Sequence, residues 1–298
     1  MRHTIASLLA SAMLVTAAVD QVHLGLTNAN VDCPNGVSVA FASDVPSAIS
    51  VSLATAGAAA KTVQTTIDTY SVKSALYNYT SPFLHTARFC NLKASTTYTY
   101  AIDAGAAGCG SAFDNSFGMP PSADAADTPT VLGIIGDVGS DHIDDTLRNT
   151  ATGINGTAAH AIFVVGDLAY ANGEHEQWDA WYRQAQPMFA SIPTLAIGGN
   201  HETTKGGGAK KPKDKKKFLP ENYLGYIPRV NNPVSAAQNA KLRTYYSMDV
   251  GHVHAVFVDD YAGYRGGDKT DGIVSSTPSD LMTTIGLPPV VGVCDLDD

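Results

Sequence analysis

The chain has 298 residues, of which 44% are hydrophobic and 16% are charged, and its formal net charge at pH 7 is -9. This composition describes a globular protein long enough for two domains, and it excludes a chain that cannot form a core. The acidic balance argues against nucleic acid or an anionic membrane surface as the main partner.

Residues 1–18 predict a signal peptide. Arg2 and His3 give a weakly basic start, and residues 5–19 are apolar and small. Such a stretch is too short for a membrane span. The alternative is a buried first helix, which fits the Ser- and Ala-rich composition less well. We expect no membrane span and a protein that is secreted to the extracellular space, or carried to a vacuole by the secretory pathway.

The cysteines agree with an exported protein. Four of them allow three disulfide connectivities, and they are Cys33, Cys90, Cys109 and Cys294. An oxidising compartment favours one disulfide among the first three. Two N-glycosylation sequons, which begin at Asn78 and Asn155, predict a glycoprotein.

Residues 19–121 predict an all-β domain. Apolar and polar residues alternate over 37–41 and 50–53, and no helical stripe is present. Leu92, a turn and then Tyr98-x-Tyr100 resemble the tyrosine corner of immunoglobulin-like and fibronectin type III sandwiches. A strand that merely contains tyrosines is the alternative. Residues 122–129, rich in Ala, Asp and Pro, predict a linker.

Residues 130–298 predict a second domain in which strands and helices alternate. Three short apolar runs, over 131–137, 161–167 and 194–200, suit strands buried on both faces of a largely parallel sheet. The intervals 137–161 and 170–192 each have room for a crossover helix. The second interval carries the apolar contacts Trp178, Trp181, Tyr182, Met188 and Phe189.

Two further segments follow the third run. Residues 205–217 contain seven lysines and no side chain that can pack well, so we expect a disordered insert beside the site. The alternative is a patch that steers phosphorylated substrates. Residues 245–259 predict one strand, and a Gly- and Ser-rich tail follows it.

Each of the three apolar runs ends at a side chain that can bind a metal ion. Asp137 ends the first, Asp167 ends the second with Tyr170 just beyond, and Asn200 ends the third with His201 next to it. Ligands of such sheets bind beyond the carboxyl ends of the strands, so these side chains should converge. Oxygen donors that include a phenol suit trivalent iron and borderline divalent ions.

These three blocks resemble three of the five signature blocks of the purple acid phosphatases, members of the calcineurin-like metallophosphoesterase superfamily. Residues 21–24 resemble the family's opening strand, and residues 178–181 resemble its helix after the second block. The resemblance covers residues 21 to about 264. It implies an α/β metallophosphoesterase sandwich, here incomplete, preceded by an all-β fibronectin type III-like sandwich domain.

The resemblance implies a dinuclear centre with Fe(III) and a second divalent metal, which would be Zn, Mn or Fe. In this reading Asp137 and Tyr170 bind the ferric ion, Asp167 bridges both metals, and Asn200 binds the second ion. Two metals at about 3.5–4 Å from each other clamp a phosphoryl group and generate hydroxide for in-line attack.

The resemblance also implies the reaction. The protein would be an acid phosphatase that hydrolyses small phosphate monoesters by metal-activated hydroxide. His201 would donate a proton to the leaving alcohol, and Glu202 would orient His201. A helix cap or turn is the alternative for any one of these residues, but it explains three strand ends together poorly.

The chain departs from the family pattern after the third block. No Val-x-x-His is present, and the Gly-His-x-His that includes His252 and His254 precedes an apolar run. We expect these two to be strand histidines without a metal. The chain then resembles a product cut between the third and fourth blocks, either a genuine truncation or a gene-model error. Missing strands would expose a sheet edge and apolar faces, and the chain could be inactive.

Two other functions stay open. One is a non-catalytic secreted binding protein that relies on the β-sandwich. The other is a metallophosphodiesterase or nucleotide hydrolase with the same metal chemistry. The sequence leaves the second metal, the physiological substrate and the oligomeric state open.

Overall fold

A computed structural model describes residues 19–103, 113–125, 127–141, 143–151, 158–203, 218–259 and 261. The predicted signal peptide and the Lys-rich insert lie outside these residues, as do Cys109, Asn155 and Cys294. No helix in the described ranges is both long enough and apolar enough to cross a membrane.

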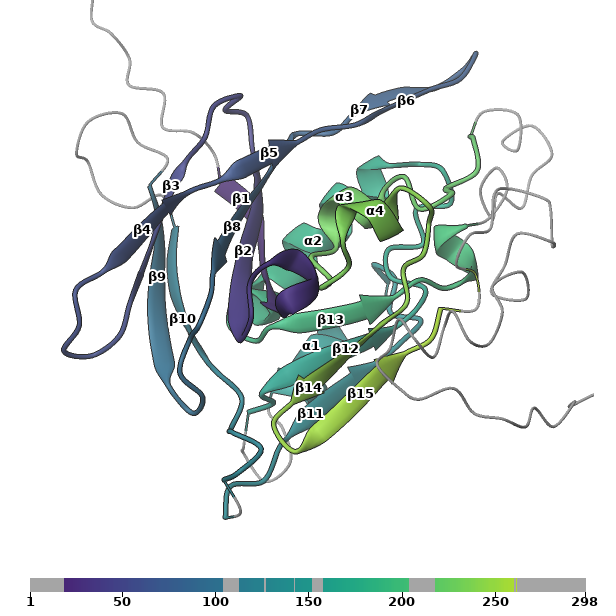
Figure 1. The fold of residues 1–298 in the computed structure, drawn as a ribbon. Coiled ribbons are helices and arrows are strands. Elements are labelled where there is room, and N and C mark those ends of the chain that lie inside the picture. Colours follow the sequence, from purple (N-terminus) through teal and green to yellow (C-terminus); the bar gives the residue numbers. More distant parts are fainter. Residues whose placement is uncertain are drawn as a thin grey trace, which may run out of the picture.

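The N-terminal part is built of strands, as predicted (Figure 1). The strands are β1 (Val19–Thr27), β2 (Gly36–Ser43), β3 (Ser50–Ala54), β4 (Lys61–Gln64), β5 (Thr66–Asp68), β6 (Ser71–Lys73), β7 (Asn78–Thr80), β8 (Phe83–Phe89), β9 (Thr97–Asp103) and β10 (Phe113–Gly118). A single 3-10 turn, η1 (Ala29–Val31), interrupts them within the described range. A four-stranded sheet, β10-β9-β3-β4, faces β1, β2 and β8 over a shared apolar core.

Two local features of this part agree with the sequence. The Tyr98 hydroxyl accepts a hydrogen bond from the backbone N–H of Lys93 at 2.9 Å, so the tyrosine closes the turn that precedes β9. Cys33 and Cys90 form a disulfide, which confirms that two of the first three cysteines pair. The sequon residue Asn78 is exposed on β7.

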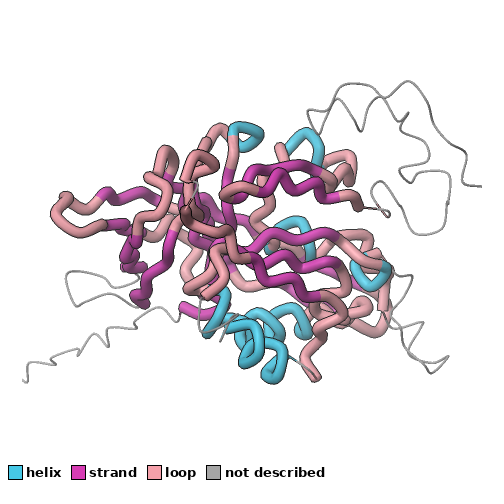
Figure 2. Tube along the Cα trace, turned by 90° about the horizontal axis from the view of Figure 1, so that it is seen from below, coloured by secondary structure: helices cyan, strands magenta, loops and turns pink. Residues whose placement is uncertain are grey.

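The C-terminal part alternates strands and helices, and this confirms the βαβ prediction. Its elements are β11 (Leu132–Ile135), α1 (Ile143–Ala151), β12 (Ala161–Val165), α2 (Glu176–Phe189), β13 (Thr194–Ile197), the 3-10 turn η2 (Asn200–Glu202), α3 (Tyr226–Arg229), α4 (Ala236–Asn239), β14 (Tyr246–Val250) and β15 (Val253–Phe257). Figure 2 shows the same division, with strands and loops at one end and helices around the other part.

One mixed sheet joins the two parts in the order β11-β12-β13-β1-β2-β8-β5. Strands β11, β12, β13 and β1 run parallel, whereas β2, β8 and β5 continue antiparallel. Gly25 of β1 pairs with Thr194 of β13, and the Thr194 hydroxyl donates to the Leu24 carbonyl at 3.0 Å. The first strand of the chain therefore extends the sheet that carries the strand-end motifs.

The two faces of β11–β13 have different covers. Ile162 and Val164 share an apolar cluster with Trp178 and Trp181 of α2. On the other face, Phe163 meets Phe257 of β15 edge-on, with ring centroids 4.9 Å apart. The alternation of β12 side chains thus separates a helix-covered face from a hairpin-covered face.

The prediction of one strand over residues 245–259 is wrong. The segment forms a hairpin of β14 and β15 whose turn is Gly251-His252, so His252 lies in a turn rather than in mid-strand. Gly251 has φ +59°, and a Cβ atom there would lie 2.1 Å from the Thr130 hydroxyl oxygen. The two runs look continuous in sequence because only Gly251 and His252 separate them.

The prediction that the strands are buried on both faces does not hold fully at β11 and its neighbour β12. Ile134 is 66% exposed, and Val165 of the neighbouring β12 is 48% exposed. Both side chains lie on the hairpin-covered face, beyond the area that β14 and β15 cover. β11 is the end strand of this sheet among the described residues, so the two side chains form an exposed apolar patch at its edge.

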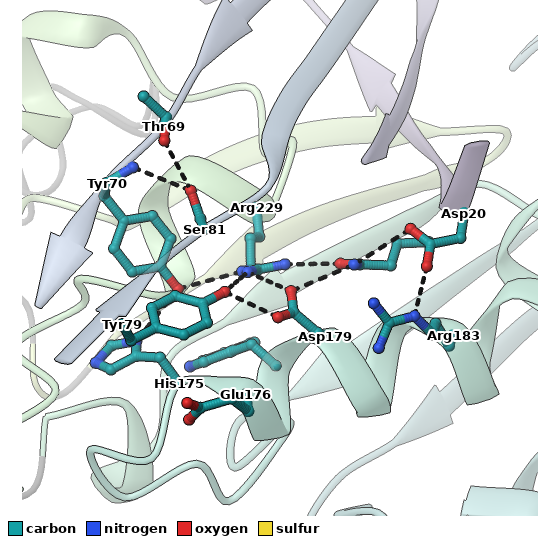
Figure 3. Close-up of polar contacts among 12 residues, drawn as sticks. Asp20, Thr69, Tyr70, Tyr79, Ser81, His175, Glu176, Asp179, Arg183 and Arg229 are labelled. Atoms are coloured by element: carbon teal, nitrogen blue, oxygen red, sulfur yellow. Dashed lines mark hydrogen bonds and ion pairs between the residues drawn. The ribbon is translucent and has the colours of Figure 1, made fainter. Parts of the chain in front are cut away.

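A buried polar cluster centred on Arg229 links the N-terminal strands to α2 (Figure 3). The guanidinium donates to Gln21, Tyr79 and Asp179, in each case at 2.7 Å. Arg229 is 2% exposed, and Tyr79 also donates to Asp179 at 3.0 Å. The charge of Arg229 is thus neutralised and its hydrogen bonds are satisfied inside the protein.

Candidate metal centre

The three strand-end loops meet at one edge of the sheet because β11, β12 and β13 are parallel neighbours. The N–H of Asp137 donates to the Gly166 carbonyl at 3.2 Å, and the N–H of Gly139 donates to the Leu168 carbonyl at 2.9 Å. These two bonds fix the first loop against the second.

Three of the predicted ligands have left-handed backbones. The φ angles are +52° at Asp137, +52° at Asp167 and +50° at Tyr170. A non-glycine residue in this region costs of order 1–3 kcal/mol, and such residues cluster at functional sites. Positive φ also occurs in turns elsewhere, for example at Asp32 and Asn35, so it is the grouping of three such residues at neighbouring strand ends that favours a site.

The side chains of Asp137 and Tyr170 meet directly. The Tyr170 hydroxyl donates to Asp137 Oδ1 at 2.7 Å. Two oxygens that bind one metal ion at about 2.1 Å on perpendicular axes are about 3 Å apart. The pair therefore has nearly the separation of two ligands of one ion.

Asn200 lies beside Asp167, because both of its chain neighbours contact that carboxylate. The backbone N–H of His201 donates to Asp167 Oδ1 at 2.9 Å. On the other side, a Cβ atom on Gly199 would lie 2.2 Å from the same oxygen, so only glycine permits this close approach. The third loop is thus packed onto the second one.

The charges at this edge are unbalanced. Burial raises the pKa of Asp167, and the neighbouring Asp137 carboxylate adds to this, while the His201 N–H opposes it. Burial and the contact with Asp137 also raise the pKa of Tyr170. Throughout the described part of the chain, neither Asp137 nor Asp167 forms an ion pair with a Lys or Arg side chain.

This donor set fits hard or borderline cations. Two neighbouring carboxylates, a phenol and an amide provide oxygen ligands, and no Lys or Arg of the described residues forms an ion pair with the two carboxylates. Within the described residues, no three His, Cys, Asp or Glu side chains form a cluster that could hold a metal. Only two of the four predicted donors belong to those residue types, so the remaining donors are oxygens of Tyr170 and Asn200.

The structure gives Glu202 a role different from the predicted one. Its carboxylate is 1% exposed and accepts from the backbone N–H groups of Asp167 at 3.0 Å, Leu168 at 3.0 Å and Gly199 at 2.8 Å. Burial raises its pKa to about 8, although these N–H groups oppose the shift. Glu202 therefore holds the second and third loops together and does not orient the His201 ring.

Two supporting residues were missed by the sequence reasoning. Asn172 contacts the His201 ring, with 2.5 Å between Oδ1 and Nδ1. Asp259, fully buried, accepts from the Tyr223 hydroxyl at 2.8 Å and from the Gly198 N–H at 3.3 Å. Asp259 ends an apolar run just as Asp137 and Asp167 do, so this signal was present in the sequence.

His252 and His254 lie away from the predicted ligands. His252 contacts the Thr130 hydroxyl at 3.1 Å, next to the beginning of β11, whereas Asp137 follows the end of that strand. His254 pairs with the exposed Asp249 at 2.6 Å. The structure therefore does not bring these two histidines to the strand-end site.

The edge is open to solvent. Asp137 and Asn200 are exposed, and Tyr170 and His201 are half-buried. A cavity of about 400 Å³ begins at Asp137 and Tyr170 and extends along residues 138–141 to Gln177. This volume is sufficient for a small ligand.

The comparisons with known proteins agree with this geometry. Residues 130–279 match the family model described as calcineurin-like phosphoesterase, so the chain belongs to the calcineurin-like phosphoesterase family. Several curated relatives of the chain are purple acid phosphatases. This confirms the resemblance to that group that the sequence motifs predicted.

Two curated relatives show the extent of the similarity. Purple acid phosphatase 1 of Ipomoea batatas is 27% identical over 197 residues, which cover 63% of this chain and 37% of the relative. Fe(3+)-Zn(2+) purple acid phosphatase 12 of Arabidopsis thaliana is 29% identical over 213 residues, covering 68% and 40%. The matched region thus spans about two fifths of these relatives.

A solved structure supports the fold. The purple acid phosphatase PPD1 isolated from yellow lupin (Lupinus luteus) seeds superposes with a TM-score of 0.62 at 18% identity. The match covers 90% of this chain and 48% of that one. The calcineurin-like phosphoesterase fold with a mixed sheet is therefore shown.

Proposed function

We propose that the chain is a metal-dependent acid phosphatase that hydrolyses phosphate monoesters at a dinuclear centre of Fe(III) and a divalent ion. The observation that carries this proposal is the meeting of Asp137, Asp167 and Tyr170 in strained backbone conformations at one sheet edge. Similarity to purple acid phosphatases, one of them named as an Fe(3+)-Zn(2+) enzyme, supports it.

Asp137 and Tyr170 would hold the ferric ion, Asp167 would bridge, and Asn200 would hold the second ion, for which zinc is the first candidate. The bound cations supply Lewis-acid charge at the phosphoryl oxygens and lower the pKa of water for in-line attack. His201, half-buried beside Asp167, would meet the leaving-group oxygen and give it a proton. The open cavity beside Tyr170 leaves room for the alcohol part of the substrate.

Two other parts of the protein belong to the same proposal. The β-rich first part would be a fibronectin type III-like sandwich, supported by its two facing sheets and by the Tyr98 hydrogen bond. The apolar residues 1–18 and the Cys33–Cys90 disulfide support entry into the secretory pathway, which would make the protein secreted or vacuolar. A non-catalytic binding protein is not favoured, because it gives no reason for the strained acidic edge.

The test is metal loading of the full chain with iron and zinc, followed by metal analysis, visible absorption and hydrolysis of p-nitrophenyl phosphate at acidic pH. We expect bound metal, a visible charge-transfer band and hydrolysis. Tyr170→Phe should abolish the band, because that band requires the phenolate. A chain that binds no metal and hydrolyses nothing would refute the proposal.

A further inference from the structure

The ring of His201 is held by a residue to which neither the sequence reasoning nor the comparisons give a role. Asn172 Oδ1 lies 2.5 Å from His201 Nδ1. The other amide atom, Nδ2, donates to the Tyr170 carbonyl oxygen at 3.0 Å. One side chain therefore bridges the loop that carries a predicted ligand and the histidine that would face the substrate.

The orientation of the Asn172 amide follows from its partners. A carbonyl oxygen can only accept hydrogen bonds, so the amide nitrogen must point toward Tyr170. The amide oxygen is then left for His201, and it too can only accept. Nδ1 of His201 must therefore carry the proton, and Nε2 becomes the ring nitrogen that can face a ligand.

The rest of the loop holds Asn172 in place. Asn172 has φ +54°, a left-handed conformation that asparagine tolerates better than most residues. The next residue, Gly173, donates its N–H to the fully buried Glu221 at 2.7 Å. The His201 ring also packs on Tyr170, with centroids 4.1 Å apart. The histidine is thus fixed before any substrate arrives.

We propose that Asn172 is a positioning residue that keeps His201 in the Nδ1–H tautomer and aims Nε2 at the leaving-group oxygen. This inference rests on the proposed phosphatase function. When the P–O bond breaks, its electron pair goes to the leaving oxygen, which takes the Nε2 proton of the protonated ring. The neutral ring that remains keeps its Nδ1 proton, the one that Asn172 accepts.

Three variants separate this role from a structural one. Asn172→Gly removes the amide but keeps a residue that adopts positive φ. Asn172→Asp keeps an acceptor for Nδ1–H. Asn35→Gly is the matched control, because Asn35 is an exposed asparagine with φ +46° in the N-terminal part.

The first measurement uses the full chain without metal, so it does not depend on activity. Long-range ¹H–¹⁵N NMR of the neutral His201 ring, assigned with His201→Asn, should show the Nδ1–H tautomer in the wild type, Asn172→Asp and Asn35→Gly. Asn172→Gly should show a mixture with Nε2–H. A wild type in the Nε2–H form, or an unchanged tautomer in Asn172→Gly, would overturn the proposal.

The second measurement uses the metal-loaded chain. For an alkyl phosphate, Asn172→Gly should lower kcat about tenfold with KM unchanged, which is less than the 10²–10⁴-fold that a whole general acid contributes. The loss should be smaller for p-nitrophenyl phosphate, whose leaving group needs little protonation, and Asn172→Asp should restore kcat. Equal losses on both substrates would overturn the positioning role. A wild type that hydrolyses neither substrate but shows the expected tautomers would refute the phosphatase and retain the role of Asn172.

Discussion

Two polar clusters in this molecule differ in whether protein side chains neutralise their charges. Around Arg229, one guanidinium meets the carboxylate of Asp179 and the polar atoms of Gln21 and Tyr79, and all of these are buried. At the sheet edge, Asp137 and Asp167 gather oxygens without a Lys or Arg partner among the described residues. The first cluster is complete without a ligand, whereas the second leaves two carboxylates without a Lys or Arg partner in the part of the chain that the structure describes.

Left-handed backbones occur in both clusters. Gln21, which accepts a hydrogen bond from Arg229, has φ +59°, and three residues at the sheet edge, Asp137, Asp167 and Tyr170, have φ angles of +50° to +52°. Internal neutralisation indicates a structural role. Three left-handed residues grouped with two carboxylates that have no Lys or Arg partner among the described residues indicate a binding role.

Asp167→Asn should have the largest effect at the edge. It should remove bound metal and lower turnover by at least ~10³-fold, equal to about 4 kcal/mol. The metal-free protein should become more stable by up to about 1 kcal/mol, because one of two neighbouring carboxylates loses its charge. Metal analysis, kinetics and urea unfolding measure these effects, with the exposed Asp145→Asn as control. If the metal-free variant instead had a much lower free energy of unfolding than the wild type, Asp167 would have a structural role and the prediction would be wrong.

Arg229→Met should destabilise the folded protein, in contrast to Asp167→Asn. It leaves Asp179 buried without its cation, so the free energy of unfolding should fall by about 3 kcal/mol or more. Arg183→Met, which breaks an exposed ion pair with Asp20, should cost less than about 1 kcal/mol. Urea unfolding compares the two variants. Similar small losses would contradict the structural reading of the Arg229 cluster.

Glu221 should make stability depend on pH. It is fully buried, and burial raises its pKa from 4.5 to about 7. Between these values the folded protein keeps the proton and the unfolded chain loses it, so the contribution of Glu221 to stability falls as pH rises from 4.5 to about 7. Two other buried groups contribute in the same window. His175, whose pKa burial lowers from 6.5 to about 4, makes stability rise with pH, and Glu202, whose pKa burial raises to about 8, makes it fall. The contribution of Glu221, at most about 3 kcal/mol, should therefore appear as the difference between the urea unfolding curves of the wild type and Glu221→Gln across this window.

The double variant His252→Ala, His254→Ala should have the smallest effect. Both side chains are exposed and lie on the β14–β15 hairpin. We expect metal content to be unchanged and the free energy of unfolding to change by less than about 0.5 kcal/mol. Loss of metal from the folded double variant would show that these histidines are ligands.

Local sequence patterns predicted that the three strand-end loops meet at one sheet edge. Apolar runs that end at Asp137, Asp167 and Asn200 identify parallel strand ends, since each run needs only its own residues to be recognised. The ligand loops do meet in the structure. The supporting contacts were less visible, because a buried carboxylate such as Glu202 has the same sequence context whether it binds a ring or three backbone N–H groups.

For the fold, too, the sequence predicted local features better than contacts between distant segments. The Tyr98 turn and helix α2 follow from short-range signals, and both occur as predicted. The pairing of β1 with β13 has no such signal, because pairing between distant strands depends on the whole assembly. The hairpin turn at Gly251 was missed because a glycine between two apolar runs fits either a strand or a turn.

The pairing of Gly25 with Thr194 has a consequence for biosynthesis. The ribosome produces β1 first and reaches β13 about 170 residues later, which takes roughly ten to thirty seconds at ordinary rates of translation. During this interval one edge of β1 has no partner in the nascent chain, although the segment carries buried residues such as Val22 and Leu24. The N-terminal half therefore cannot complete its native sheet until β13 has been made, and β1 is a target during this interval for a chaperone that binds extended apolar segments.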